Sequence, residues 1–184
     1  MTAQALPGFD SPAVGFEQPF EMLEACHDRV RRSLALLDRL VEHVGTHGHD
    51  AQSRSAAADV LRYFDLAAPL HHEDEELHVF PRLEHCGDAP LEAATAGLRI
   101  DHARMEDLWA GLRVALQAWA LPGAARDVGM LPRQRAQEFG SVYAMHLRIE
   151  ETLVFPAARA RMDAGRLARM SADMQARRQP GARL

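Results

Sequence analysis

The chain has 184 residues, which is enough for one domain with a substantial core. Its formal net charge is -5 and no long block of one sign is present, so nucleic acid is not a favoured partner. No apolar run approaches the roughly 18 residues of a membrane span, and the N-terminus shows no signal-peptide pattern. Cys26 and Cys86 form no CxxC pair, which fits a reducing compartment. We therefore expect a cytoplasmic protein that binds neither membrane nor nucleic acid.

Helical periodicity runs through most of the chain. Apolar residues at the spacing of amphipathic helices predict helices over about residues 19–44, 53–85 and 89–120, and a fourth that begins near Pro132. Pro69 lies inside the second helix and should bend it. Asp88 is expected to cap the third helix. Turn sequences over 45–50 and 121–129 separate these elements.

These elements predict an all-α fold, an up-down-up-down four-helix bundle. We expect the bundle over residues 17–161, after an N-terminal arm over residues 1–16 that is rich in Pro, Gly and small residues. Residues 162–184 carry a short amphipathic pattern among arginines. They predict a short C-terminal helical tail that docks on the bundle, pairs with another subunit or remains mobile.

One motif occurs twice in the chain. Residues 71–81 read HHEDEELHVFP and residues 146–156 read HLRIEETLVFP, at an offset of 75 residues. The same offset relates His27 to His102 and Arg29 to Arg104. Each copy contains a lone His and, 44 residues later, an HxxxEE segment that ends in Phe-Pro. A repeat of this size indicates two supersecondary units that bury a shared face.

The repeated His and Glu residues fall on the apolar stripes of the predicted helices. Residues i and i+4 of a helix lie on one face, so each HxxxE pair directs an imidazole and a carboxylate to one place. A single His on such a stripe is more often a hydrogen-bonded core residue than a ligand. Six residues at repeat-equivalent positions, with no inward Arg beside the carboxylates, favour metal. The predicted ligands are His27, His71, Glu75, His102, His146 and Glu150. Mixed nitrogen and oxygen ligands suit iron and manganese, and we expect iron; zinc usually takes fewer ligands, but manganese and zinc both stay open.

Other polar residues near the predicted site are left open. His78 lies near the face of the ligands and is either an extra ligand or a neighbour of one. His72 lies one residue off that face. Glu106 follows His102 by four residues and is either a seventh ligand, a group that holds water near the metals, or a partly solvated charge. The second Glu of each repeated pair points about 100° away and is expected beside the ligands or at the surface; these are Glu76 and Glu151.

This order of residues resembles the hemerythrin-like HHE cation-binding domain family. The resemblance rests on His27, His71-xxx-Glu75, His102 and His146-xxx-Glu150, within HHxxEExxxFP and HxxxEExxxFP, and it covers about residues 20–160. It implies a four-helix bundle with a non-haem di-iron centre held by these six residues. It also implies that an oxo or hydroxo group and the two carboxylates bridge the irons.

The chain departs from the oxygen-carrying members of that family. Those proteins have HxxxH on the third helix and HxxxxD on the fourth, whereas here Glu106 replaces the second His and the fourth helix has HxxxE. A more anionic ligand set stabilises ferric iron and argues against reversible oxygen carriage. We expect a di-iron protein that reacts with or senses oxygen, peroxide or nitric oxide, in a stress-protective or oxidase-like role. A non-catalytic iron or oxygen sensor, or an iron-handling module, is the alternative, and both enzymatic turnover and a homodimer stay open.

Overall fold

The computed structural model describes residues 15–122 and 130–179. The helical elements are α1 (Pro19–His47), α2 (Ala51–Arg62), η1 (Tyr63–Ala67), α3 (Ala68–Asp74), η2 (Glu75–Val79), η3 (Phe80–Arg82), α4 (Ala89–Ala120), α5 (Met130–Ile149), η4 (Glu150–Val154), α6 (Phe155–Arg159) and α7 (Ala164–Arg177). Of these, η1, η2 and η4 are π-helical turns and η3 is a 3-10 turn. The described residues contain no strand, so the predicted all-α fold is confirmed.

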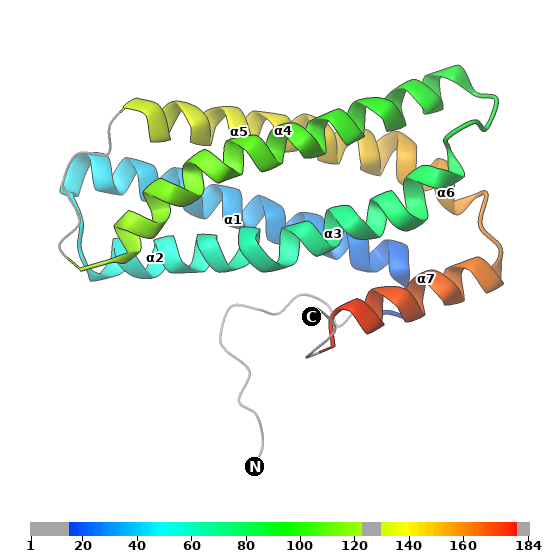
Figure 1. Cartoon of the computed structure of the whole chain (residues 1–184), viewed down its shortest axis with the longest axis horizontal. Coiled ribbons are helices and arrows are strands. Elements are labelled where there is room, and N and C mark those ends of the chain that lie inside the picture. The colour runs from blue at the N-terminus through cyan, green and yellow to red at the C-terminus, as the bar shows by residue number, and fades with distance from the viewer. Residues whose placement is uncertain (1–14, 123–129, 180–184) are drawn as a thin grey trace, which may run out of the picture.

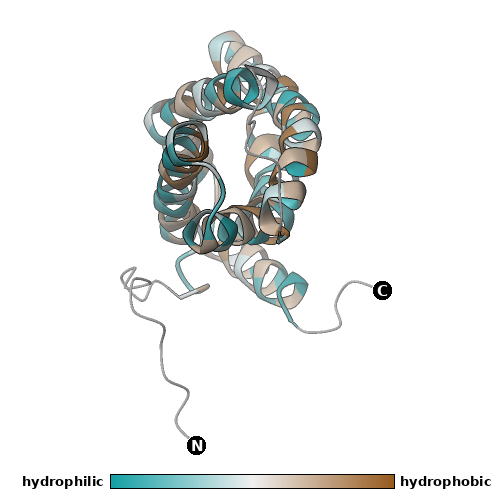
Figure 2. Ribbon diagram, turned by 90° about the vertical axis from the view of Figure 1, so that its left-hand side faces the viewer, coloured by the Kyte–Doolittle hydropathy of each residue, from teal (hydrophilic) through white to brown (hydrophobic). Residues whose placement is uncertain are grey.

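Four long helical segments pack side by side as a bundle (Figure 1). The first is α1, the second runs without a break from α2 to η3, the third is α4, and the fourth runs from α5 to α6. The segments α1 and α4 each pack against both α2 and α5. Viewed from the end, the helices surround a common interior (Figure 2). The predicted bundle is therefore present, and within the described ranges no helix has the length and apolar character needed to cross a membrane.

Two aspartates fix the starts of helices. The Asp50 side chain accepts from the backbone N–H of Ser53, and the Ser53 hydroxyl accepts from the backbone N–H of Asp50. This reciprocal cap starts α2 at Ala51, two residues before the predicted position. The Asp88 side chain accepts from the N–H of Leu91 and caps α4 as predicted.

Two helix ends differ from the prediction. Helix α1 continues three residues past Val44 to His47, so the turn predicted over 45–50 is reduced to residues 48–50. The second segment ends at Arg82 rather than near His85, because a 3-10 turn closes it. Beyond this end, His85 and Gly87 both have positive φ angles, of 60° and 81°. Most of the break predicted over 121–129, and of the arm predicted over 1–16, lies outside the described residues.

Each of three prolines inside the helical segments follows a π-helical turn by two residues; these are Pro69, Pro81 and Pro156. A proline has no N–H for the carbonyl four residues back, and its ring crowds that carbonyl. The residue before each proline instead donates to the carbonyl five residues back: Ala68 to Tyr63, Phe80 to Glu75, and Phe155 to Glu150. The wider turns absorb the prolines, and the bend predicted at Pro69 takes this form.

Two apolar clusters fill the bundle, with a polar layer between them. Along α1, Leu23 belongs to one cluster and Val30 to the other, and His27 lies between them. The same order recurs along the other three segments, where the buried His and Glu residues separate the clusters. The predicted ligands therefore sit at mid-height in the bundle, shielded by apolar side chains above and below.

Helix α7 packs across α1 and α3 on one side of the bundle (Figure 1). Met170 and Met174 are buried in one of the apolar clusters. Arg177 Nη2 lies 2.5 Å from Oδ1 of Asp74, and Arg178 Nη2 lies 2.6 Å from Oδ2 of the same carboxylate. Because Asp74 is fully buried, these two arginines balance a charge that would otherwise be costly. The predicted C-terminal tail thus contains a helix that docks on the bundle. The domain boundaries at residues 16/17 and 161/162 stay predictions.

Candidate metal centre

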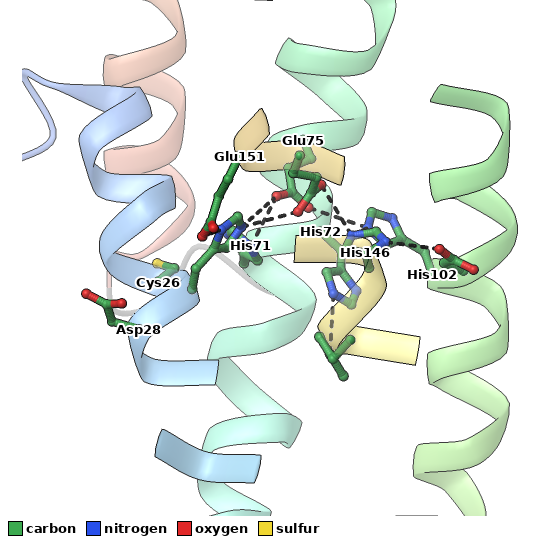
Figure 3. Close-up of polar contacts among 12 residues, drawn as sticks. Cys26, Asp28, His71, His72, Glu75, His102, His146 and Glu151 are labelled. Carbon is green, nitrogen blue, oxygen red and sulfur yellow. Dashed lines mark hydrogen bonds and ion pairs between the residues drawn. The ribbon is translucent and has the colours of Figure 1, made fainter. Parts of the chain in front are cut away.

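The six predicted ligands meet in the polar layer of the bundle. They form two groups of buried side chains, and within each group the ligand atoms all lie within 4.8 Å of one another. The first group is His27, His71, Glu75 and Glu150. The second group is Glu75, His102, His146 and Glu150. Figure 3 shows His71, His102 and His146 directed toward Glu75. Both glutamates belong to both groups, as expected for carboxylates that bridge two ions.

Facing atoms in the two groups lie at the spacing of ligands on one ion. Nε2 of His71 is 3.1 Å from Oε1 of Glu75, and Nε2 of His146 is 3.2 Å from Oε1 of Glu150. Two atoms at right angles, each about 2.1 Å from an ion, are roughly 3.0 Å apart. Both carboxylates are fully buried, yet their oxygens have no hydrogen-bond partner among the described residues. Buried carboxylates that face only imidazoles and accept no hydrogen bond are costly without positive charge beside them, so the donor set fits a bound cation.

Burial and neighbouring charges shift the pKa values of these side chains in opposite directions. Burial lowers the pKa of His27, but the carboxylates of Glu150 and Glu75 outweigh it and raise the pKa to about 10. Burial also lowers the pKa of His102, which Glu75 raises to about 9. At His71 burial dominates, and its pKa is lowered. Burial acts to raise the pKa of Glu75, but the neighbouring imidazoles hold that pKa well below its usual value. The carboxylates thus require positive charge beside them, which a metal ion would provide.

The second Glu of each repeated pair binds a lone His. Oε1 of Glu151 lies 2.8 Å from Nδ1 of His27, and Oε1 of Glu76 lies 2.7 Å from Nδ1 of His102. Because an ionised carboxylate only accepts, each Nδ1 donates, and each Nε2 is directed toward the centre, where it would be the nitrogen that faces a metal. The expectation that these glutamates lie beside the ligands is confirmed.

Arginines hold these two carboxylates in turn. Arg31 Nη2 donates to both oxygens of Glu151, at 2.8 and 2.7 Å. Arg99 Nη1 donates to Oε2 of Glu76 at 2.9 Å, and its Nε donates to Glu84. Each lone His is therefore the inner end of an Arg–Glu–His chain that begins at the surface. Such outer partners fix the orientation and tautomer of a metal-binding imidazole.

The Phe-Pro end of each repeat also contributes to the centre. The ring of Phe155 stacks on His27 at 5.2 Å between centroids, and the ring of Phe80 stacks on His102 at 5.5 Å. The following prolines impose the π-helical turns that begin at Glu75 and at Glu150. In each half, the duplicated motif therefore places one phenylalanine ring against the lone His and one π-helical turn at the shared Glu.

The remaining imidazole nitrogens differ between the halves. Nδ1 of His146 lies 3.5 Å from Oδ2 of Asp101. Nδ1 of His71 is buried and has no hydrogen-bond partner among the residues described. The repeat offset places Cys26, a buried free thiol, at the position that corresponds to Asp101. Our sequence reasoning missed Asp101, although its place directly before His102 was a signal.

Comparison with known proteins agrees with this geometry. A family model described as the hemerythrin HHE cation binding domain matches residues 18–158. That span is most of the chain and includes all six predicted ligands. The chain belongs to the hemerythrin HHE cation-binding domain family. An uncharacterized protein of Haemophilus influenzae is 32% identical over 164 residues, which cover 89% of this chain and 92% of that protein.

Two further histidines of this hemerythrin-like domain lie outside both groups. Nε2 of His78 is 2.7 Å from Oδ2 of Asp173 on α7, so His78 contributes to docking of the tail. The ring of His72 is buried and stacks on His102 at 4.0 Å between centroids. Its Nε2 lies 3.4 Å from the hydroxyl of Tyr143. His72 therefore packs against the second group without belonging to it.

Glu106 is exposed and belongs to neither group, so the structure does not support it as a seventh ligand. Together with His72 and Tyr143, it lines a cavity of about 50 Å³. The other walls are Phe64, Ala68, Pro69, Met105, Trp109 and Phe139. Burial raises the pKa of Tyr143 well above its usual value and lowers the pKa of His72 well below its usual value. Both side chains are therefore neutral, and the cavity is mostly apolar.

Proposed function

We propose that this hemerythrin-like protein binds two non-haem irons and reacts with oxygen, peroxide or nitric oxide, in a stress-protective or oxidase-like role. One observation carries the proposal: four imidazoles and two shared carboxylates, whose oxygens accept no hydrogen bond among the described residues, are buried together. Two imidazoles and a carboxylate with open positions are typical of non-haem iron sites. Zinc would leave this donor set underused, because it usually takes fewer ligands, while manganese suits the same donor types.

The residues of the chain prepare the site for such chemistry. Each group offers four donors, which leaves coordination positions of an iron free for a small ligand. Bound iron would supply a change of redox state and Lewis acidity. The Arg–Glu–His chains hold the lone imidazoles in place, and the apolar clusters on either side exclude water.

The cavity beside His72 supports a ligand of very small size. Its volume of about 50 Å³ has room for a few molecules of the size of water. His72, which forms part of its lining, stacks directly on the ring of His102. Tyr143 keeps its proton, so its hydroxyl is able to donate a hydrogen bond to a polar molecule in the cavity. These features favour diatomic gases and peroxide over larger substrates.

The decisive experiment combines metal analysis with absorption spectra of anaerobically purified protein before and after exposure to air. We expect about two irons per chain and new near-ultraviolet charge-transfer bands on oxidation. Consumption of peroxide or nitric oxide should rise in proportion to iron content. Inert protein with a full iron content would contradict the proposed reactivity, and tightly held metal other than iron would contradict the iron assignment.

A second candidate is an iron or oxygen sensor without turnover. The observation that favours it is the contact between α7 and Asp74, the residue directly before the shared ligand Glu75. A change of metal state at Glu75 would then alter how firmly α7 is held. Under this alternative, metal removal should increase protease cleavage between the bundle and α7 while peroxide is not consumed. A cytoplasmic location and a homodimer stay predictions, and reversible oxygen carriage is less favoured.

A further inference from the structure

A second pocket lies between α1 and the part of the second helical segment where α2 ends and η1 follows. Its volume is about 490 Å³, within the range of small-molecule sites. The residues that line it are Arg29, Arg32, Ser33, Leu36, Asp59, Arg62, Tyr63, Leu66 and Ala67. Three arginines and one acid therefore face this pocket, and none of the six predicted metal ligands lines it.

The surroundings of Arg29 in this pocket differ from those of its repeat equivalent, Arg104. Arg29 corresponds to Arg104, and Tyr63 corresponds to Glu138, through the offset of 75 residues. In the second half, Arg104 Nη2 donates to Oε1 of Glu138 at 2.7 Å. In the first half the matching acid is absent, because Tyr63 stands there and donates its hydroxyl to the backbone carbonyl of Cys26 at 3.3 Å. The next pair of equivalent residues, Phe64 and Phe139, are both core residues, which supports this alignment.

Among the described residues, no other acid pairs with Arg29 in place of the missing equivalent of Glu138. Asp59 is the only carboxylate in the lining of the pocket, and Arg62 Nη2 donates to its Oδ1 at 2.7 Å. Within the described ranges, no carboxylate lies at ion-pair distance from Arg29, although this side chain is half-buried. A half-buried guanidinium with no counter-charge is an incomplete interaction. The first half thus keeps the cation of the repeated pair without its anion.

The backbone beside Arg29 also departs from the repeat. The π-helical turn η1 lies at the pocket, whereas the equivalent residues 138–142 lie in the regular helix α5. Pro69 explains the difference, since Ala144 stands at the equivalent position in the second half. This wider turn presents Leu66 with 62% of its surface exposed. Leu66 forms an apolar wall with Leu36 and Ala67.

We propose that this pocket binds a small organic anion with an apolar body. Its carboxylate or phosphate would take the place that the Glu138 carboxylate has beside Arg104, and would pair with Arg29. Its apolar body would lie against Leu36 and Leu66. The inference is independent of the metal centre, because the pocket and its charges do not involve the ligands.

Calorimetric titration of the full chain tests the proposal with benzoate, phenyl phosphate, inorganic phosphate and uncharged benzyl alcohol as probes. We expect benzoate or phenyl phosphate to bind, and the tighter of the two identifies the anionic group that the site prefers. Benzyl alcohol and inorganic phosphate should each bind at least about tenfold more weakly, since each lacks one of the two required parts. Failure of every anion to bind at about 10 mM would overturn the proposal.

Variants separate the pocket from general charge effects. Arg29→Gln should weaken binding about tenfold or more, whereas Arg39→Gln removes an exposed arginine of the same helix outside the pocket and should change nothing. Tyr63→Glu should abolish binding by restoring the internal acid of the second half, and Tyr63→Phe should not. Circular dichroism and metal content confirm that each variant is folded. Unchanged binding in Arg29→Gln and Tyr63→Glu, or an equal loss in Arg39→Gln, would refute the site.

Discussion

In the first half of the repeat, helix α7 covers one face of α3, the helix that carries His71 (Figure 1), whereas α5, the helix that carries His146, packs against α1, α4 and η4. The covered face carries Asp74 and His78, which pair with residues of α7. The equivalent positions in the second half are Ile149, which packs against an apolar cluster, and Leu153, which is 39% exposed. The offset that relates the six predicted ligands thus places polar residues on this face in one half and apolar residues at the equivalent positions in the other.

The residues that match between the halves are those of the two candidate metal groups and their direct neighbours. The lone imidazoles, the shared carboxylates, the second glutamates and the phenylalanines of Phe-Pro match between the halves. The proposed pair of like ions would need two equal donor sets, which agrees with this match. The surfaces behind them carry no such demand, and they have acquired a docked helix, a small cavity and a basic pocket.

The largest effect should come from the carboxylates that both halves share. Glu75→Gln or Glu150→Gln removes a charge from both groups, so we expect both metals to be lost, from about two ions per chain to nearly none. His71→Ala and His146→Ala should each affect mainly one group. Metal analysis after anaerobic reconstitution measures this, with Glu24→Gln, an exposed residue of α1, as control. Retention of both metals in Glu75→Gln would contradict the bridging role.

The next effect tests the covered face of the first half. Replacing both Arg177 and Arg178 by Ala leaves the Asp74 charge buried without a partner, which should destabilise the protein by about 3–5 kcal/mol. Asp74→Ile introduces the residue of the second half and should cost much less, because the two arginines can then reach solvent. Urea unfolding followed by circular dichroism compares the variants. Equal losses would mean that the aspartate, rather than the unpaired charge, matters.

A smaller and symmetric effect is expected at the second glutamates. Glu76→Gln and Glu151→Gln should each lower metal affinity roughly 10–100-fold, because each weakens the hold on one lone imidazole. Since the two contacts have nearly equal lengths, the two losses should be similar. Asp101→Asn should have less effect, as its contact with His146 is longer. Competition with a chelator measures the affinities, and a large difference between the first two variants would break the symmetry.

The smallest effect concerns pH and the docking of α7. Burial acts to raise the pKa of Asp173, but His78 and Arg177 outweigh it, and the pKa lies below its ordinary value of 3.8. A carboxylate with a lowered pKa stabilises the fold above its ordinary pKa, and the contribution is lost as the pH falls through the lowered value. Asp173→Asn should therefore cost less than about 1 kcal/mol at neutral pH.

Urea unfolding of the full chain at several pH values measures this contribution. The difference between the Asp173→Asn variant and the unchanged chain should shrink toward zero as the pH falls below 3.8 and through the lowered pKa, where the carboxylate becomes protonated in both folded and unfolded states. A difference that grows on acidification would have the wrong sign.

The sequence by itself determined the four helical segments, the repeat and the six candidate ligands. Helical periodicity is a local property, so the spacing of His71 and Glu75 already fixes them on one face. The offset of 75 residues then identifies their partners without any knowledge of packing. The prolines at the ends of the motifs were visible too, although the π-helical turns that accommodate them were not expected.

Only the tertiary structure decided which residues meet across helices. Glu151 binds His27 from 124 positions away, and Arg177 reaches the buried Asp74 from the last described helix. Periodicity gives a face but leaves the rotation of each helix uncertain, which is why the role of Glu106 stayed open in the sequence, whereas the packed helices leave it exposed. The unmatched charge of Arg29 is equally invisible in the sequence, because it depends on which acids surround it once the helices pack.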